Sequence, residues 1–157
     1  MTKKRLYFAG PLFSQAEREF NCNLKKHLAL YFDVFLPQEN GGLFANMVAD
    51  GMAIDRAAKK VFNCDVEAIE SADVLLIVLD GRAVDEGAAF ELGIAYARGK
   101  KCIALQTDMR RLLPIGNNPM IDCAVESTFE NVDSLLAWAH AFVNETSNSQ
   151  KKRTSKY

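Results

Sequence analysis

The chain has 157 residues, of which 49% are hydrophobic and 25% are charged, and its formal net charge is −1. These values fit one globular domain with a sizeable core and exclude a disordered or fibrous chain. The segment 146–157 is basic and contains no acid, so the remaining body is acidic and lacks the electrostatic signature of a nucleic-acid-binding protein.

The cysteines and the N-terminus favour a cytoplasmic protein. Neither metal-ligand nor redox-motif spacing occurs among Cys22, Cys64, Cys102 and Cys123, which therefore indicate reduced thiols. The N-terminal sequence MTKKRLYFAG has too short an apolar run for a signal peptide. No segment approaches the roughly 20 apolar residues of a membrane span. We expect no membrane partner and no nucleic-acid partner.

The first third of the chain predicts two strands that flank a helix, followed by a long loop. Gly10 and Pro11 close the first strand, and a capping box of Ser14 and Glu17 starts the helix. A long loop in a compact domain is more often functional than filler. The expected elements are a strand over 5–9, a helix over about 14–31, a strand over 33–36 and a loop over 38–50.

The middle of the chain predicts a helix, a fully buried strand and a second helix. The first of these helices covers about 53–71, and its apolar stripe comprises Ile54, Ala58, Val61, Phe62 and Ile69. Asp65 falls on the same stripe, so its carboxylate is expected to face inward. The strand over 73–79 is nearly all apolar, as strands covered on both faces are.

The last third predicts two further strands and one helix. The expected elements are a strand over 101–105, an irregular segment over 112–124, a short strand near 125–129 and a helix over about 132–143. One domain should cover residues 1–145, and residues 146–157 are expected to be a polar, basic, disordered tail.

The alternation of strands and helices predicts an α/β doubly wound parallel sheet of five strands in the order 2-1-3-4-5. In such sheets the ligand site lies beyond the carboxyl ends of the strands. The loops over 9–13, 38–46 and 80–87 should converge at that edge.

Glu91 is the most informative single residue of the sequence. It is the one charged residue between Gly87 and Ala97, in a helix expected within 84–100. Its neighbours on the helical face are Ala88 and Ala95, so it should face inward, where an unpaired carboxylate is costly. Near the start of a helix the dipole favours the ionised form by roughly 0.3–1 kcal/mol. Glu91 is thus a candidate nucleophile, or simply a favourable residue for a first helical turn.

Three other side chains near the same edge have two interpretations each. Asp85 is either the N-cap of the helix that carries Glu91 or a member of the site. Asp65 is either satisfied by a buried hydroxyl or backbone partner or available for chemistry. Tyr7 is either a packed aromatic or a hydrogen-bond partner of Glu91. Acids in different environments can divide the work, one attacking while another protonates a leaving group.

Several catalytic motifs are missing from the sequence. There is no GxGxxG and no Walker motif, so a dinucleotide or P-loop site is not indicated. His27 and His140 lie on predicted helices far in sequence from the loop edge and suggest neither a triad nor a zinc site.

Four segments together resemble the nucleoside 2-deoxyribosyltransferases. They are YFAGPLF at 7–13, DVEAIESADVLLIVLD at 65–80, DEGAAFELGIA at 85–95 and NPM at 118–120. The resemblance extends to about residue 143, and its most specific part is the D-x-G-x-A-x-E-x-G pattern of the third segment. It implies a flavodoxin-like fold and transfer of a 2-deoxyribosyl group between nucleobases by double displacement with retention, with no metal or organic cofactor.

The resemblance also implies residue roles. Glu91 matches the nucleophile, Asp65 and Asp85 match the acids that contact the base and assist its protonation, and Tyr7 matches the tyrosine that positions the nucleophile. Asn118 matches an asparagine lent by a neighbouring subunit, which implies a homo-oligomer with shared active sites. Further candidates for binding the deoxyribonucleoside or free base are Gly10, Gly87, Gln38 and Asn40.

Two other functions stay open from the sequence. Related N-glycosidases hydrolyse 2′-deoxyribonucleoside 5′-monophosphates and need phosphate-binding residues in the first loop, whereas residues 10–13 here are apolar and favour a free 5′-hydroxyl. A receiver-like or nucleoside-binding module without enzymatic activity would use the same sheet order. A receiver needs an acidic pair after the first strand, which residues 9–11 lack. The sequence does not decide between purine and pyrimidine substrates.

Overall fold

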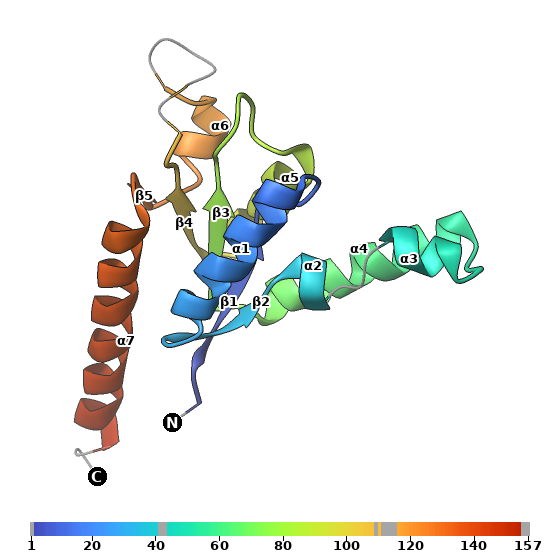
Figure 1. The fold of residues 1–157 in the computed structure, drawn as a ribbon. Helices are drawn as coiled ribbons and strands as arrows, with labels where there is room; N and C mark the ends of the chain where they lie inside the picture. The colour runs from blue at the N-terminus through green and yellow to red at the C-terminus, as the bar shows by residue number, and fades with distance from the viewer. Residues whose placement is uncertain (1, 41–43, 109, 111–115, 155–157) are drawn as a thin grey trace.

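The computed structural model describes residues 2–40, 44–108, 110 and 116–154. Its five-stranded parallel sheet has the order β2-β1-β3-β4-β5, which confirms the predicted architecture (Figure 1). The strands are β1 (Lys4–Ala9), β2 (Phe32–Phe35), β3 (Val74–Val78), β4 (Lys101–Leu105) and β5 (Ser127–Phe129). The helices are α1 (Gln15–Leu28), α2 (Pro37–Asn40), α3 (Phe44–Ala49), α4 (Ile54–Ser71), α5 (Glu86–Ala97), α6 (Pro119–Asp122) and α7 (Val132–Thr154).

The sheet separates two hydrophobic cores, and β1 contributes to both. Leu6 and Phe8 point to the core shared with α1 and α7. Tyr7 and Ala9 point to the opposite core, formed with α4 and α5. Because successive side chains of a strand alternate between faces, this register places Tyr7 on the same side of the sheet as α5.

Helix α5 approaches the sheet closely through small side chains. Ala88 and Ala95 are 2% and 0% exposed, and Leu92 between them is 1% exposed. This buried stripe is the one predicted around Glu91. It fixes the rotation of α5, so Glu91 is held at the margin of the core rather than on the solvent face.

The segments predicted as irregular contain short helices. Helix α3 and all of helix α2 except its first residue, Pro37, lie within the predicted loop over 38–50. Residues 41–43 between the two helices are outside the described part of the chain. Helix α6 lies within the predicted irregular segment over 112–124, of which 112–115 are likewise outside it. Helices of four to six residues leave little periodicity for a sequence pattern to reveal.

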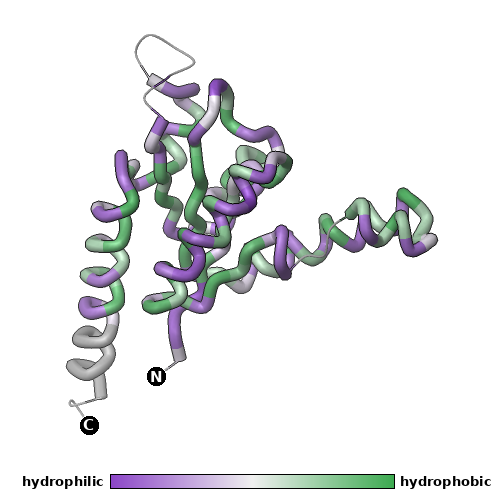
Figure 2. Tube along the Cα trace, in the orientation of Figure 1, coloured by the Kyte–Doolittle hydropathy of each residue, from purple (hydrophilic) through white to green (hydrophobic). Residues whose placement is uncertain are grey.

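The predicted inward stripe of α4 is only partly correct. Ile69 is buried, but Ile54 and Phe62 are 66% and 53% exposed. The N-terminal part of α4, with α3 beside it, extends beyond the sheet and has no layer to cover (Figure 1). Hydrophobic positions nevertheless continue along this projecting part (Figure 2).

Helix α7 is longer than predicted. It begins at Val132 as expected but continues to Thr154, through most of the segment predicted to be a disordered tail, and 155–157 are outside the described residues. Helix α7 thus runs past residue 145, and the domain boundary predicted there stays a prediction. Across the described ranges, every helix is too short or too polar to cross a membrane.

Candidate functional site

A cavity of about 290 Å³ between α4 and α5 contains two of the predicted acids, Asp65 and Glu91. Its other walls are mainly apolar and include Val61, Phe62 and Phe90. This volume is at the lower end of the range of small-molecule sites, about 300–1,000 Å³. Carboxylates in such surroundings lose hydration, so their protonation depends on the few polar groups that face them.

The hydroxyl of Tyr7 donates a hydrogen bond to Oε1 of Glu91 over 2.8 Å. The Tyr7 side chain is fully buried, and its ring stacks on Phe35 with a centroid distance of 5.4 Å. Both sequence-based interpretations of Tyr7 therefore hold, since packing fixes the ring and the ring aims the hydroxyl. Burial and the charge of Glu91 raise the pKa of Tyr7 above its ordinary value, which keeps the hydroxyl protonated as a donor.

Burial raises the pKa of Glu91 from 4.5 to about 8, and the charges of Asp65 and Asp85 add to this effect. The Tyr7 hydrogen bond opposes the shift without cancelling it. In the free chain, burial therefore outweighs the preference of the helix dipole for ionised Glu91. The dipole contributes less than about 1 kcal/mol, whereas each pKa unit corresponds to about 1.4 kcal/mol. At neutral pH most free chains carry a proton on Glu91.

Asp65 is half-buried and lacks a full set of hydrogen bonds. Its Oδ1 has no hydrogen-bond partner among the described residues. Burial raises the pKa of Asp65 from 3.8 to about 6, against a smaller opposing effect of the Tyr7 hydroxyl. Asp65 is therefore satisfied only in part by a hydroxyl partner, and its role in chemistry stays a prediction. An unpaired acid with a pKa near neutrality can hold a proton for a ligand in the cavity.

Asp85 caps the helix that carries Glu91. Its Oδ1 accepts a hydrogen bond from the backbone nitrogen of Ala88 over 2.8 Å, which confirms the N-cap interpretation. A Cβ added at Gly87 would lie 3.2 Å from the same oxygen. Gly87 therefore leaves room for the carboxylate of Asp85 beside the cavity.

We expect Gly87→Ala to reduce the base exchange that the family resemblance implies several-fold, by displacing the Asp85 carboxylate. Gly93→Ala on the same helix is the matched control, because a Cβ there meets no atom of the described residues within 4 Å. Alanine favours helices over glycine by up to about 1 kcal/mol, so Gly93→Ala should be as stable as the wild type or more so. Steady-state rates and melting curves of both variants test this. Equal activity of the two variants would show that the position of Asp85 does not matter.

The titration of Asp65 and Glu91 predicts a bell-shaped pH profile for kcat/KM. The transfer that the family resemblance implies needs one proton on the pair, with Glu91 ionised and Asp65 protonated. This is the minor singly protonated form, because the pKa of Glu91 is about 8 and that of Asp65 is about 6. Activity should fall below the first value, as both acids become protonated, and above the second, as both ionise. Rates measured from about pH 4 to 10 check this, and a flat profile between about pH 5 and 9 would contradict it.

Asn118 lies apart from Glu91 within the same chain. Its Oδ1 accepts a hydrogen bond from the backbone nitrogen of Met120 over 2.9 Å at the start of α6. The side chain lines a separate cavity of about 210 Å³ with Gln106 and Asn117. One chain alone therefore does not bring Asn118 to the two acids of the first cavity.

The two candidates after β2 are also separate from Glu91. The side-chain amide of Gln38 is hydrogen-bonded to residues of α1. Its Nε2 donates to the carbonyl of Arg18, and its Oε1 accepts from Nδ2 of Asn21, each over 3.0 Å. The Oδ1 of Asn40 accepts from the backbone nitrogen of Leu36 over 3.0 Å. The roles of Gln38 and Asn40 in binding a base stay predictions.

Gly10 marks a close approach between the first loop and the sheet. A Cβ at this position would lie 3.2 Å from Cβ of Val78, at the end of β3. The chain that leaves β1 therefore stays in contact with the carboxyl edge, three residues after Tyr7. A substrate role of Gly10 remains a prediction.

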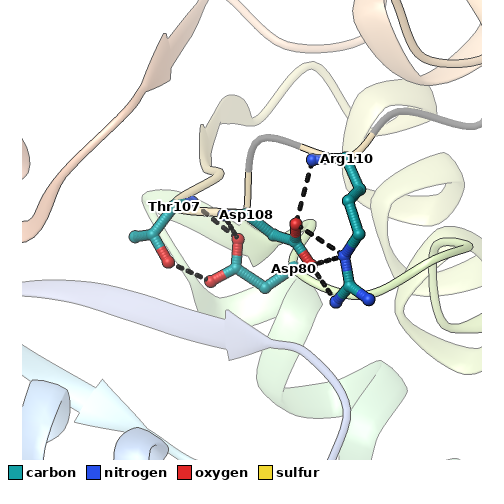
Figure 3. Close-up of polar contacts among 4 residues, drawn as sticks. All are labelled: Asp80, Thr107, Asp108 and Arg110. Atoms are coloured by element: carbon teal, nitrogen blue, oxygen red, sulfur yellow. Dashed lines mark hydrogen bonds and ion pairs between the residues drawn. The ribbon is translucent and has the colours of Figure 1, made fainter.

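Asp80 has a structural task that the sequence did not indicate. Its carboxylate accepts hydrogen bonds from the backbone nitrogen and hydroxyl of Thr107, each over 2.6 Å, and from the backbone nitrogen of Asp108 over 2.8 Å (Figure 3). Hydrogen bonds from Arg110 lower the pKa of Asp108 well below its usual range. Asp80 thus joins the loops that follow β3 and β4.

The described residues contain no group of three or more His, Cys, Asp or Glu side chains arranged to hold a metal ion. All four cysteines are free thiols. What the structure does assemble is an acid pair with a tyrosine donor: Tyr7, Asp65 and Glu91, with Asp85 nearby.

Known structures share this fold. A conserved protein from Enterococcus faecalis V583 is 27% identical, with a TM-score of 0.75 over 89% of this chain and 99% of that chain. A 2-deoxyribosyltransferase from Bacillus psychrosaccharolyticus is 24% identical, with a TM-score of 0.69 over 84% of this chain and 90% of that chain. A CMP N-glycosidase from Clostridium botulinum is 18% identical, with a TM-score of 0.56 over 85% and 96% of the two chains.

No curated protein matches the chain closely enough to assign it. The sequence profile of the nucleoside 2-deoxyribosyltransferases, in contrast, matches residues 6–145, which include β2 to β5, most of β1, the acid pair and Asn118. The chain is therefore a member of the nucleoside 2-deoxyribosyltransferase family.

Proposed function

We propose that this protein transfers the 2-deoxyribosyl group from one nucleobase to another through a covalent ester on Glu91, with retention at C1′. The observation that supports it most is the Glu91 carboxyl group, which lies in an apolar cavity, takes one hydrogen bond from Tyr7 and shares the cavity with Asp65. The substrates are 2′-deoxyribonucleosides and free nucleobases, and cytoplasmic nucleoside salvage is the setting that we propose.

In the first step the ionised carboxylate of Glu91 attacks C1′ and the glycosidic bond breaks. The electron pair of that bond leaves with the base, and Asp65 donates its proton to the base nitrogen. Positive charge that develops at C1′ and the ring oxygen is stabilised by the adjacent carboxylate. Tyr7 holds the attacking group in place through its hydrogen bond.

In the second step a new base attacks C1′ from the face that the first base left. The ester bond to Glu91 breaks, the carboxylate is released, and the incoming base returns a proton to Asp65. Two inversions give net retention. Water that reaches the ester would release free deoxyribose, so hydrolysis is the expected side reaction.

Incubation of the protein with deoxyinosine and adenine tests the proposed function. We expect deoxyadenosine and hypoxanthine in equal amounts, detected by chromatography. Release of free deoxyribose with no exchange would instead favour an N-glycosidase. A panel of purine and pyrimidine acceptors in the same assay defines the base range.

Hydrolysis of a deoxyribonucleoside 5′-monophosphate is the second candidate, because the fold is shared with a CMP N-glycosidase. A phosphate would be bound most readily by the free backbone nitrogens at a helix N-terminus. At the start of α1 the Oε2 of Glu17 already accepts hydrogen bonds from the nitrogens of Phe13 and Ser14. These bonds lower the pKa of Glu17, so a negative charge occupies that position.

We therefore expect base release from deoxycytidine 5′-monophosphate to be much slower than exchange with deoxycytidine or deoxyinosine. Parallel assays at equal substrate concentration distinguish the two functions. Faster turnover of the monophosphate would favour the hydrolase.

We also infer that the protein acts as a homo-oligomer whose sites are shared. The cavity of Glu91 is flanked by exposed rings of Phe62 and Phe90, at 53% and 59%, which a second subunit could cover. Asn118 lines a different cavity of its own chain and is exposed there. Mixing inactive Glu91→Ala protein with inactive Asn118→Ala protein should restore part of the exchange activity. No recovery from mixed, refolded oligomers would contradict shared sites.

A further inference from the structure

The loop between β1 and α1, residues 10–14, is held by the side chains of the helix that follows it, and we call it the first loop. Glu17 binds two of its backbone nitrogens, over 3.0 and 2.7 Å. Nη1 of Arg18 donates to the carbonyl oxygens of Leu12 over 3.2 Å and of Phe13 over 2.6 Å. The loop backbone is thus fixed through both its donors and its acceptors.

A buried asparagine of α1 connects the first loop to the segment that follows β2. Asn21 is 2% exposed, and its Nδ2 donates to the carbonyl of Pro11 over 2.9 Å and to Oε1 of Gln38 over 3.0 Å. Nε2 of Gln38 in turn donates to the carbonyl of Arg18 over 3.0 Å. The segments after β1 and β2, which meet at the carboxyl edge, are therefore tied through α1.

Polar contacts rather than packing determine the shape of the first loop. Phe13 is 74% exposed, and Leu12 is only half-buried. The loop begins three residues after Tyr7, whose hydroxyl binds Glu91, and Gly10 keeps it against the end of β3. A displacement of the loop would therefore act at the edge where the sheet binds its ligand.

We propose that Arg18 is a positioning residue for deoxyribosyl transfer, acting together with Glu17 and Asn21. Resting on the proposed function, this role is to hold the first loop at the carboxyl edge of the sheet, just after the strand that carries Tyr7, so that the second base rather than water reaches the sugar ester. Arg18 itself does not contact the reacting atoms; it acts through the carbonyls of Leu12 and Phe13.

Arg18→Met tests this role, because it removes the guanidinium and keeps an aliphatic stem. Lys26→Met is the matched control: it removes the same charge from the same helix, and Nζ of Lys26 contacts Asn23 rather than the first loop. We expect kcat/KM for exchange to fall about 10-fold in Arg18→Met, since small misplacements near a reacting group cost up to about 100-fold. The kcat/KM of Lys26→Met for exchange should stay within about twofold of the wild-type value, because this change displaces no group near the reacting atoms.

A second readout separates positioning from stability. The fraction of sugar lost to water should rise several-fold in Arg18→Met, and Arg18→Lys, which can still donate to one carbonyl, should restore part of the transfer. Assays are run well below the melting temperature of each variant. An unchanged ratio of hydrolysis to transfer in Arg18→Met, or a kcat/KM equal to that of Lys26→Met, would overturn the positioning role. Failure of the wild type to exchange bases would overturn the proposed function as well.

Discussion

Glu91→Ala should reduce base exchange by about 10⁴- to 10⁶-fold, the range seen when a covalent nucleophile is removed. The fold should persist, because α5 is held by Ala88, Leu92 and Ala95 rather than by Glu91. Exchange of deoxyinosine and adenine is measured by chromatography, and the fold is checked by circular dichroism. Glu86→Ala, which removes an exposed acid from the first turn of the same helix, is the control and should keep near wild-type rates.

The isosteric change Glu91→Gln should abolish exchange and also change the pH dependence of stability. The pKa of Glu91 is raised to about 8, so between about pH 4.5 and 8 the folded chain holds a proton that the unfolded chain releases. The free energy of unfolding of the wild type should therefore fall as the pH rises through that window. The glutamine variant should not show this fall, because its side chain does not titrate. By pH 8 the variant should be more stable by on the order of 2–4 kcal/mol. Equal urea midpoints at pH 5 and pH 8 in both proteins would contradict the burial of Glu91.

Asp65→Asn should slow exchange by about 10²- to 10⁴-fold, the usual contribution of a general acid. Asparagine keeps the shape of the side chain but cannot donate a proton to the departing base. The matched control is Glu67→Gln, which neutralises an exposed acid on the same helix two residues away and should leave the rate unchanged.

The leaving group distinguishes an acid from a merely structural carboxylate. A deoxynucleoside whose base departs readily without protonation should be cleaved by Asp65→Asn at nearly the wild-type rate, while deoxyinosine is not. A uniform loss for all leaving bases would show that Asp65 shapes the cavity rather than supplying a proton.

The sheet and the orientation of α5 were predictable because they depend on local periodicity. Alternation along β1 separates Tyr7 from Phe8, and the 3.6-residue period places Glu91 in line with Ala88 and Ala95. Both patterns can be recognised within a short stretch of the sequence. They suffice to bring a strand tyrosine and a helix carboxylate to one side of a parallel sheet.

The protonation of the site was not predictable from the same patterns. The helix dipole is a local property and favours ionised Glu91, but the raised pKa results from burial by α4, the sheet and a second acid. Likewise Ile54 and Phe62 follow a helical stripe, yet no sequence pattern tells that α4 extends beyond the sheet.

The hydrogen-bond network of the loops was largely invisible in the sequence, although one signal existed. Gln38 was a candidate for base binding, and only the tertiary structure shows its amide bound to α1. Asn21, by contrast, is three residues before Leu24 and seven before Leu28, on the buried face of α1. A polar residue on an apolar stripe indicates a buried hydrogen bond, and this one leads to the first loop.

The most direct measurement is a mass spectrum of the protein quenched after mixing with a deoxynucleoside in the absence of an acceptor base. We expect one added deoxyribosyl group, located by peptide mapping at Glu91, that disappears when adenine is added and never forms in Glu91→Gln. Active exchange with no adduct at any quench time, or with the sugar on another residue, would contradict Glu91 as the nucleophile.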